Sequence, residues 1–83
     1  MPYWLYILRC GDGTLYTGTT DNVERRLAVH QGGKGAKYTR GRGPLTVVYR
    51  EACEGRSAAL RREIAIKRLT RAEKLALIEG GGV

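Results

Sequence analysis

The 83-residue sequence contains no phenylalanine and has only one histidine, one methionine, one tryptophan and two cysteines. The two cysteines, Cys10 and Cys53, are too few for a disulfide scaffold and lack the spacing of metal ligands. A single histidine adds too little to complete a zinc site. We therefore expect neither disulfides nor zinc to stabilise the chain, and Trp4, the five tyrosines and the aliphatic residues must supply its core.

Long apolar segments are also missing. A bilayer-spanning helix needs about 20 apolar residues, and the longest apolar run, from Pro2 to Leu8, is much shorter. No basic region precedes this run, as one would in a signal peptide. We expect a cytoplasmic protein that does not associate with membranes.

Acidic residues are scarce relative to basic ones. Fifteen Lys and Arg against eight Asp and Glu give a net charge of +7, which favours a polyanionic partner, with nucleic acid first. The alternative is that the charge serves solubility alone. The length suits one domain, which we place at residues 1–79, followed by a flexible Gly-rich tail at 80–83. We expect a monomer or a weak homodimer.

The first two predicted strands form a hairpin. Tyr3 to Arg9 is apolar on both faces, as in a central strand, and Leu15 to Thr19 is the return strand. The Asp12-Gly13 pair between them is a strong hairpin signal. Tyr6 and Tyr16 should therefore lie on neighbouring antiparallel strands.

Three helices and a third strand follow. Asp21 is the predicted cap of a helix in which Val23, Leu27 and His30 share one face, with Arg26 beside them and Arg25 turned to solvent. Leu45 to Ala52 is the third strand. Ser57 should cap a helix to about Leu69, and Thr70 a last helix to about Glu79. The order β-β-α-β-α-α predicts an α+β fold, a small three-stranded antiparallel sheet flanked by helices.

Glu63 is an anomaly within the Ser57–Leu69 helix. On a helical wheel it falls inside the apolar arc of Ala59, Leu60, Ile64 and Ile66. A buried carboxylate is costly without a partner. Lys67, four residues on, offers an ordinary ion pair; the alternative is a ligand for Mg²⁺ or Mn²⁺. Helix geometry alone favours the ion pair.

The order of these residues resembles the GIY-YIG nuclease family. The resemblance rests on Tyr6, on Tyr16-Thr17-Gly18, on Arg26 and His30 in the next helix, and on Glu63 in a later one. It also includes the segments GAKYTRGRGP and ALRREIAIKRL, as in small standalone bacterial GIY-YIG domain proteins. The signature triplets here are Trp4-Leu5-Tyr6 and Tyr16-Thr17-Gly18, which keep both tyrosines and the glycine.

The resemblance implies metal-dependent hydrolysis of phosphodiester bonds. Glu63 would anchor one Mg²⁺ or Mn²⁺, and Arg26 would hold a phosphate oxygen. Tyr16 would be the general base or position the water, a role that needs nearby positive charge from Arg26 or Lys37. Tyr6 would orient the water or Tyr16, and His30 would assist proton transfer or fix Tyr16.

The Gly-rich segment from Gly32 to Pro44 is a predicted loop. Basic and aromatic side chains in it suit contacts to phosphate and stacking on bases. Gly18 would leave room for the substrate to approach Tyr16. The predicted nucleic-acid-binding residues are Gly18, Lys34, Lys37, Tyr38, Arg40, Arg42 and Lys67.

The sequence leaves two functions open. The first is a nuclease acting on nucleic acid, with DNA as the first candidate, sensitive to structure or ends rather than sequence, with a role such as DNA repair. The second is a nucleic-acid-binding accessory module that keeps the scaffold with weak or no cleavage. The altered triplets favour the second, as does the lack of any asparagine after Asn22, because several nucleases of the family use an asparagine late in the domain. The retained tyrosines, Arg26 and Glu63 favour the first.

Overall fold

The computed structural model describes residues 2–32 and 43–81 of the chain. Its elements follow the predicted order β-β-α-β-α-α. They are β1 (Tyr3–Arg9), β2 (Leu15–Thr20), α1 (Val23–Gln31), β3 (Thr46–Cys53), α2 (Arg56–Lys67) and α3 (Arg71–Gly81). The α+β class and the three-stranded antiparallel sheet are confirmed, and α3 continues two residues past the predicted end at Glu79.

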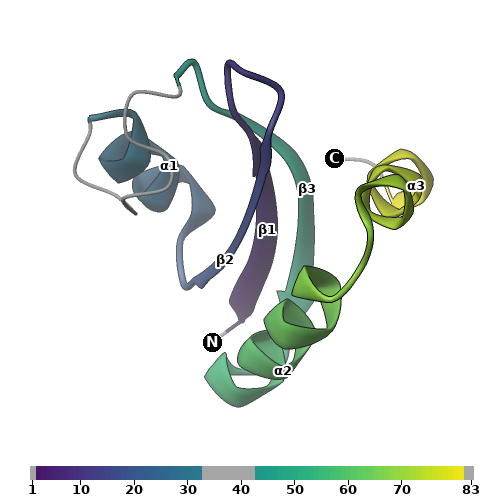
Figure 1. Ribbon diagram of the computed structural model, residues 1–83. Coiled ribbons are helices and arrows are strands. Elements are labelled where there is room, and N and C mark those ends of the chain that lie inside the picture. Colours follow the sequence, from purple (N-terminus) through teal and green to yellow (C-terminus); the bar gives the residue numbers. More distant parts are fainter. Residues whose placement is uncertain (1, 33–42, 82–83) are drawn as a thin grey trace.

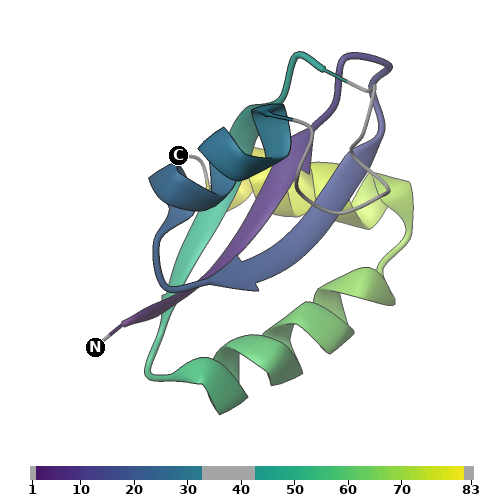
Figure 2. The ribbon, with the colours of Figure 1, turned by 90° about the vertical axis from the view of Figure 1, so that its left-hand side faces the viewer.

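β1 is the central strand of a sheet with the order β2-β1-β3. Leu5, Tyr6, Ile7 and Leu8 are all buried in it, which explains why this stretch is apolar on both faces. Figure 1 shows α1 on one side of the sheet and α3 on the other. Figure 2 shows α2 running alongside β2. The central strand therefore separates two small cores.

One core lies between the sheet and α1, and the other lies on the α2 and α3 side. Tyr6, Leu8, Val23 and Leu45 are buried in the first, with Trp4, Tyr16, Leu27 and Val47 packed against them. The second core contains the buried residues Leu5, Ile7, Tyr49 and Ile66. Alternate residues of β1 thus enter opposite cores, as the period of a strand requires.

The hairpin between β1 and β2 forms at the predicted turn. Gly13 has φ of 88°, a conformation that glycine adopts without steric cost. Asp12 Oδ1 accepts from the Thr14 amide at 3.1 Å and from the Thr14 hydroxyl at 2.6 Å. The turn fixes the register that places Gly18 opposite Tyr6 on β1.

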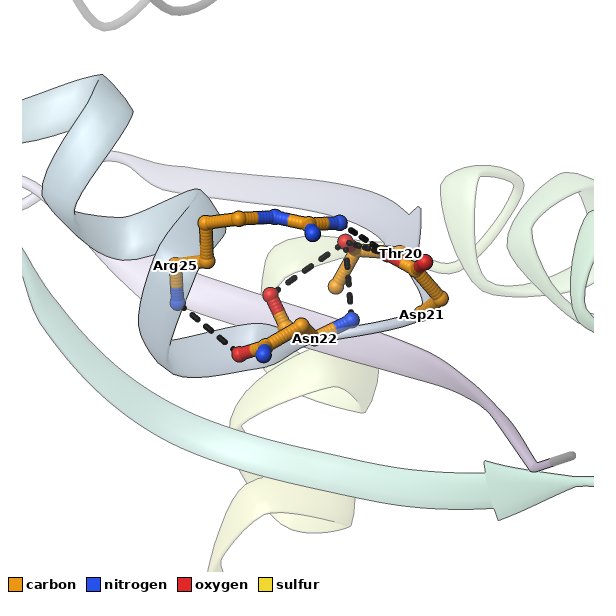
Figure 3. Close-up of polar contacts among 4 residues, drawn as sticks. All are labelled: Thr20, Asp21, Asn22 and Arg25. Atoms are coloured by element: carbon orange, nitrogen blue, oxygen red, sulfur yellow. Dashed lines mark hydrogen bonds and ion pairs between the residues drawn. The ribbon is translucent and has the colours of Figure 1, made fainter.

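α1 begins one residue later than predicted. Its N-cap is Asn22, whose Oδ1 accepts from the Arg25 amide at 3.0 Å, while Thr20 Oγ1 accepts from the Asn22 amide (Figure 3). Asp21 instead forms an ion pair with the Arg25 side chain, and Glu24 pairs with Arg50 of β3. Asp21 and Asn22 are equally good caps by residue type, so the sequence cannot separate them.

The starts of the other two helices differ in outcome. The predicted cap at Thr70 is confirmed as a reciprocal capping box: Glu73 Oε1 accepts from the Thr70 amide at 2.8 Å, and Thr70 Oγ1 accepts from the Glu73 amide at 3.2 Å. The predicted cap at Ser57 is wrong. α2 begins at Arg56 after Gly55, and no side chain caps it.

The apolar arc predicted for α2 is wider than the observed one. Ala59 and Ile66 are buried, whereas Leu60 and Ile64 are 39% and 54% exposed. α2 lies alongside β2, so only a narrow stripe of it meets the sheet (Figure 2). The Glu63 side chain is 17% exposed, which places it at the border of this stripe.

Candidate active site

Three aromatic rings gather on the α1 side of the sheet. Tyr6 and Tyr16 come from neighbouring strands, and their ring centroids lie 6.4 Å apart. The ring of His30, from the last turn of α1, lies 6.3 Å from that of Tyr6 and 5.3 Å from that of Tyr16. Residues 14 positions apart along the chain are thus neighbours, because α1 folds back over the hairpin. We refer to Tyr6, Tyr16 and His30 as the ring cluster.

His30 is hydrogen-bonded to Tyr6. Its Nε2 lies 3.1 Å from the Tyr6 hydroxyl oxygen, and both side chains are only 2% exposed. A buried hydroxyl and a buried imidazole nitrogen each need a partner, so this bond satisfies both groups at once. It also fixes the orientation of the imidazole ring beside Tyr16.

Two further predicted site residues lie within electrostatic reach of Tyr6. Burial raises the pKa of Tyr6 to about 12; the Arg26 guanidinium opposes this rise, and the charges of Tyr16 and Glu63 add to it. Arg26 of α1 and Glu63 of α2 therefore lie near enough to Tyr6 to change its pKa. Arg25, the neighbour of Arg26, is exposed and points elsewhere. The structure thus brings together Tyr6, Tyr16, Arg26, His30 and Glu63.

The raised pKa of Tyr6 restricts its chemistry. At neutral pH the Tyr6 phenol stays protonated, so it cannot serve as a base and can only donate or accept hydrogen bonds. Burial, together with the positive charge of Arg26, lowers the pKa of His30 below its ordinary value of 6.5. His30 is therefore a neutral imidazole at pH 7.

The lowered pKa of His30 predicts a pH-dependent stability. Unfolding returns His30 to its ordinary pKa, so the unfolded chain binds a proton at a pH where the folded chain does not yet bind it. The contribution of His30 to the free energy of unfolding should therefore be complete above about pH 6.5 and should fall as the pH drops below that value. Chemical denaturation between about pH 7.5 and pH 5 measures this effect.

The matched variant for that measurement is His30→Gln, which removes the titrating group and keeps a polar side chain. Its unfolding free energy should change less with pH over the same range than that of the wild type. Burial raises the pKa of Glu51, but hydrogen bonds to Tyr49 and Arg62 lower it by more. A hydrogen bond to Arg50 lowers the pKa of Glu24. The stability that these two carboxylates contribute is therefore lost only at lower pH. Identical pH profiles for wild type and His30→Gln would contradict a buried neutral His30.

Gly18 packs against Tyr6. It is buried, and a methyl group built on it would lie 2.7 Å from the Tyr6 hydroxyl oxygen and 2.8 Å from Tyr6 Cζ. The space that glycine leaves is therefore filled by Tyr6 across the hairpin. The contact of Gly18 with nucleic acid stays a prediction.

Glu63 and Lys67 form the ion pair that helix geometry favours. Lys67 Nζ lies 3.0 Å from Glu63 Oε2, and the Lys67 side chain is 54% exposed. Lys67 also lines a hollow of about 300 Å³ together with Tyr16 and with Lys74 from α3. No sequence pattern predicted that Lys74 lies here, because it comes from a different helix and matches no motif.

A divalent cation fits this site only in one way. No group of three or more His, Cys, Asp or Glu side chains that could hold a metal ion lies within residues 2–32 and 43–81. A complete protein cage is therefore not available in that part of the chain. Mg²⁺ commonly binds through one or two carboxylates, with water and substrate phosphates filling the other positions, and Glu63 supplies one carboxylate of this kind.

The predicted loop contacts Lys34, Lys37, Tyr38, Arg40 and Arg42 lie outside the described residues. Within the described residues, no helix is long and apolar enough to cross a membrane. The positions that the structure does assign to the site all come from β1, β2, α1 and α2.

Comparison with known proteins gives a consistent picture. A model of the GIY-YIG catalytic domain matches residues 2–76. The chain is 56% identical over 77 residues to a UPF0213 protein of Oceanobacillus iheyensis, a match that covers 93% of this chain and 90% of the relative. A UPF0213 protein of Natronomonas pharaonis is 54% identical over 76 residues, a match that covers 92% of this chain and 89% of the relative.

Two structures solved by solution NMR are similar to the fold described above. The UPF0213 protein of Bacillus halodurans is 46% identical with a TM-score of 0.65, covering 99% of this chain and 87% of that one. A protein of E. faecalis is 40% identical with a TM-score of 0.62, and the match covers 93% of this chain and 83% of that one. The ring cluster, Arg26 and Glu63 are thus carried by a chain that belongs to the GIY-YIG family, among the small standalone domain proteins named UPF0213.

Proposed function

We propose that this protein is a nuclease that hydrolyses phosphodiester bonds in nucleic acid with the help of one Mg²⁺ or Mn²⁺ ion, and that its substrate is DNA. The observation that carries the proposal is the ring cluster on the α1 side of the sheet, with Arg26 and Glu63 close enough to Tyr6 to change its pKa. Membership of a nuclease family and the net charge of +7 support a nucleic-acid substrate.

Each residue has a role that its surroundings support. Glu63 would hold the divalent ion, which when bound stabilises negative charge on the scissile phosphate and the departing oxygen. Arg26 would hold a non-bridging phosphate oxygen through its planar guanidinium. For this reaction Lys67 would leave Glu63 and pair with a substrate phosphate, a move that its 54% exposure allows.

Tyr16 and His30 would take part in proton transfer from the attacking water. The water oxygen forms a bond to phosphorus, the bond to the departing oxygen breaks, and that oxygen takes a proton from solvent. Tyr16, having lost its hydroxyl proton to solvent, would position the water and receive its proton as the phenolate, and His30 would fix the Tyr16 ring. Tyr6, kept protonated by its raised pKa, would act as a positioning residue by holding His30 through the 3.1 Å hydrogen bond.

Contacts of this kind carry little sequence information. Lysine and arginine side chains bind phosphate, and phosphate contacts position a strand without reading its bases. The cleavage would therefore depend on strand ends, flaps or branches rather than on sequence. A role in DNA repair, in the cytoplasm, would suit such a preference.

The test is cleavage of labelled single-stranded, duplex, flap and branched oligonucleotides by purified protein in Mg²⁺, Mn²⁺ or EDTA. The proposal predicts products in the presence of metal, none in EDTA, and a preference among substrate structures that persists when the sequence is scrambled. Binding without metal-dependent products on every substrate, DNA or RNA, would overturn it.

The second candidate is a nucleic-acid-binding module without cleavage. One observation favours it: in the structure the Glu63 carboxylate is paired with Lys67, which would have to be displaced before a metal ion could bind. The absence of asparagine after Asn22 points the same way. The cleavage assay separates the two functions, because only the first gives metal-dependent products.

A further inference from the structure

Three hollows follow one another along the β2 side of the molecule. The first, which includes Tyr16, is lined by Leu15, Tyr16, Thr17, Lys67 and Lys74. The second, of about 170 Å³, is lined by Thr14, Leu15, Arg71 and Lys74. The third, of about 420 Å³, lies at the hairpin end of the sheet and includes Arg9, Gly11, Gly13 and Arg71.

Shared residues make these hollows continuous. Leu15 and Lys74 line both the first and the second hollow, and Arg71 lines both the second and the third. A path therefore runs from Tyr16 along the end of β2 to the tip of the hairpin. We name the basic residues along it, Lys67, Lys74, Arg71 and Arg9, the basic track.

The charge of this path has one sign. Four Lys and Arg side chains line the three hollows, and among the described residues no Asp or Glu lines any of them. Nearby carboxylates have other partners: Asp12 accepts from Thr14, and Glu73 closes the capping box with Thr70. A concave surface with only positive side chains attracts phosphate groups.

A polar atom on the path also lacks a partner. Thr17 Oγ1 is buried, and within the described part of the chain nothing forms a hydrogen bond with it, although Thr17 lines the first hollow beside Tyr16. Buried hydroxyl groups are normally hydrogen-bonded. An oxygen or nitrogen atom of a bound ligand in that hollow would supply the missing partner.

We infer that the basic track is a second binding site for the sugar-phosphate backbone, which holds the nucleic-acid strand on one side of the bond to be cleaved. This inference rests on the proposed function for its substrate, but it concerns a surface that begins at Tyr16 and extends away from the ring cluster. Tyr16 and Gly13 are three residues apart, which limits their separation to at most roughly 10 Å. This length corresponds to at most about three nucleotides of helical rise.

The experiment measures binding in EDTA, so that cleavage does not enter the result. The affinity for labelled single-stranded and duplex oligonucleotides is determined by fluorescence anisotropy over a several-fold range of KCl concentration. The test variant is Arg9→Gln/Lys74→Gln. It leaves intact the 2.9 Å hydrogen bond from Arg71 to the Gly13 carbonyl, so the hairpin keeps its contact with α3.

The matched control is Arg61→Gln/Arg68→Gln, which removes the same charge. Arg61 and Arg68 are exposed, and they lie two and nine residues after buried Ala59, which turns both to roughly the opposite side of α2. Melting curves verify that both double variants remain folded.

The slope of log K against log salt should become shallower in Arg9→Gln/Lys74→Gln. The expected change is about 0.9 per lost contact on duplex DNA and about 0.7 on a single strand. The dissociation constant at low salt should rise roughly tenfold, while the control keeps the wild-type values. Wild-type binding by the test variant, or equal losses in both double variants, would overturn the inference.

The result that would contradict the proposed function differs from the result that would contradict the basic track. If Arg9→Gln/Lys74→Gln weakens binding but the wild type never yields metal-dependent products, the basic track stands and the nuclease does not. If the wild type cleaves and the test variant binds normally, the nuclease stands and the track does not.

Discussion

Replacing Glu63 by glutamine should abolish metal-dependent cleavage while leaving nucleic-acid binding in EDTA at least as tight as in the wild type. Glutamine keeps the size of the side chain but removes the negative charge that would hold the cation. The rate should fall by about 10²–10³ or more, the cost of losing a main source of electrostatic stabilisation. The measurement is single-turnover cleavage of the best substrate at saturating protein.

The control for this prediction is Glu54→Gln, which removes the same charge from an exposed residue just before α2. Glu54→Gln should cleave at the wild-type rate. Glu63→Gln also breaks the ion pair with Lys67, so its melting temperature must be compared with that of the wild type. Undiminished cleavage by folded Glu63→Gln would show that the cation is held elsewhere.

Gly18→Ala should destabilise the fold and disturb the ring cluster together. The added methyl group would lie 2.7 Å from the Tyr6 hydroxyl, and Tyr6 is buried and bonded to His30, so its ring has little freedom to move. Overpacking of this kind costs about 1–3 kcal/mol. For a domain of this size the melting temperature should fall by on the order of 10 °C, and cleavage should fall as well.

Gly80→Ala is the matched control, because a methyl group on Gly80 meets nothing within 4 Å. Alanine in a helix is favoured over glycine, so this variant should be unchanged or slightly more stable. The double variant Tyr6→Leu/Gly18→Ala should lose less free energy of unfolding than the two single variants lose together. The reason is that Tyr6 is the residue with which the methyl group collides. A Gly18→Ala protein as stable as the wild type would contradict the observed packing.

The parts of the fold that local sequence patterns determine were predictable. Asp12-Gly13 identifies the hairpin, and the two-sided apolar run from Tyr3 to Arg9 identifies the central strand, because both signals lie within a few residues. The Thr70–Glu73 capping box was also predicted, since its two partners are three residues apart.

The cap of α1 and the width of the α2 contact were not predictable. Asn22 rather than Asp21 caps α1, because the two residues are equally good caps by type and Asp21 instead pairs with Arg25. A helical wheel gives the direction of Glu63 but not the width of the contact, so Leu60 and Ile64 were expected to be buried. The second error arises from packing between elements far apart in the sequence.

In the candidate site, too, some features were predictable from the sequence and others were not. Residue order and family resemblance selected Tyr6, Tyr16, Arg26, His30 and Glu63. Neither could reveal that His30 bonds to Tyr6, or that Gly18 accommodates the Tyr6 hydroxyl. These relations depend on the register between β1 and β2 and on the position of α1 over them.

Paramagnetic broadening of NMR signals by Mn²⁺, in the presence of a non-cleavable oligonucleotide, tests most directly whether Glu63 holds a divalent cation beside the ring cluster. We expect selective loss of the signals of Glu63, Lys67 and the rings of Tyr6, Tyr16 and His30 in the wild type. In Glu63→Gln the signals of Lys67 and of the three rings should be retained. The same broadening in both proteins, or broadening centred away from these residues, would show that Glu63 does not hold the cation.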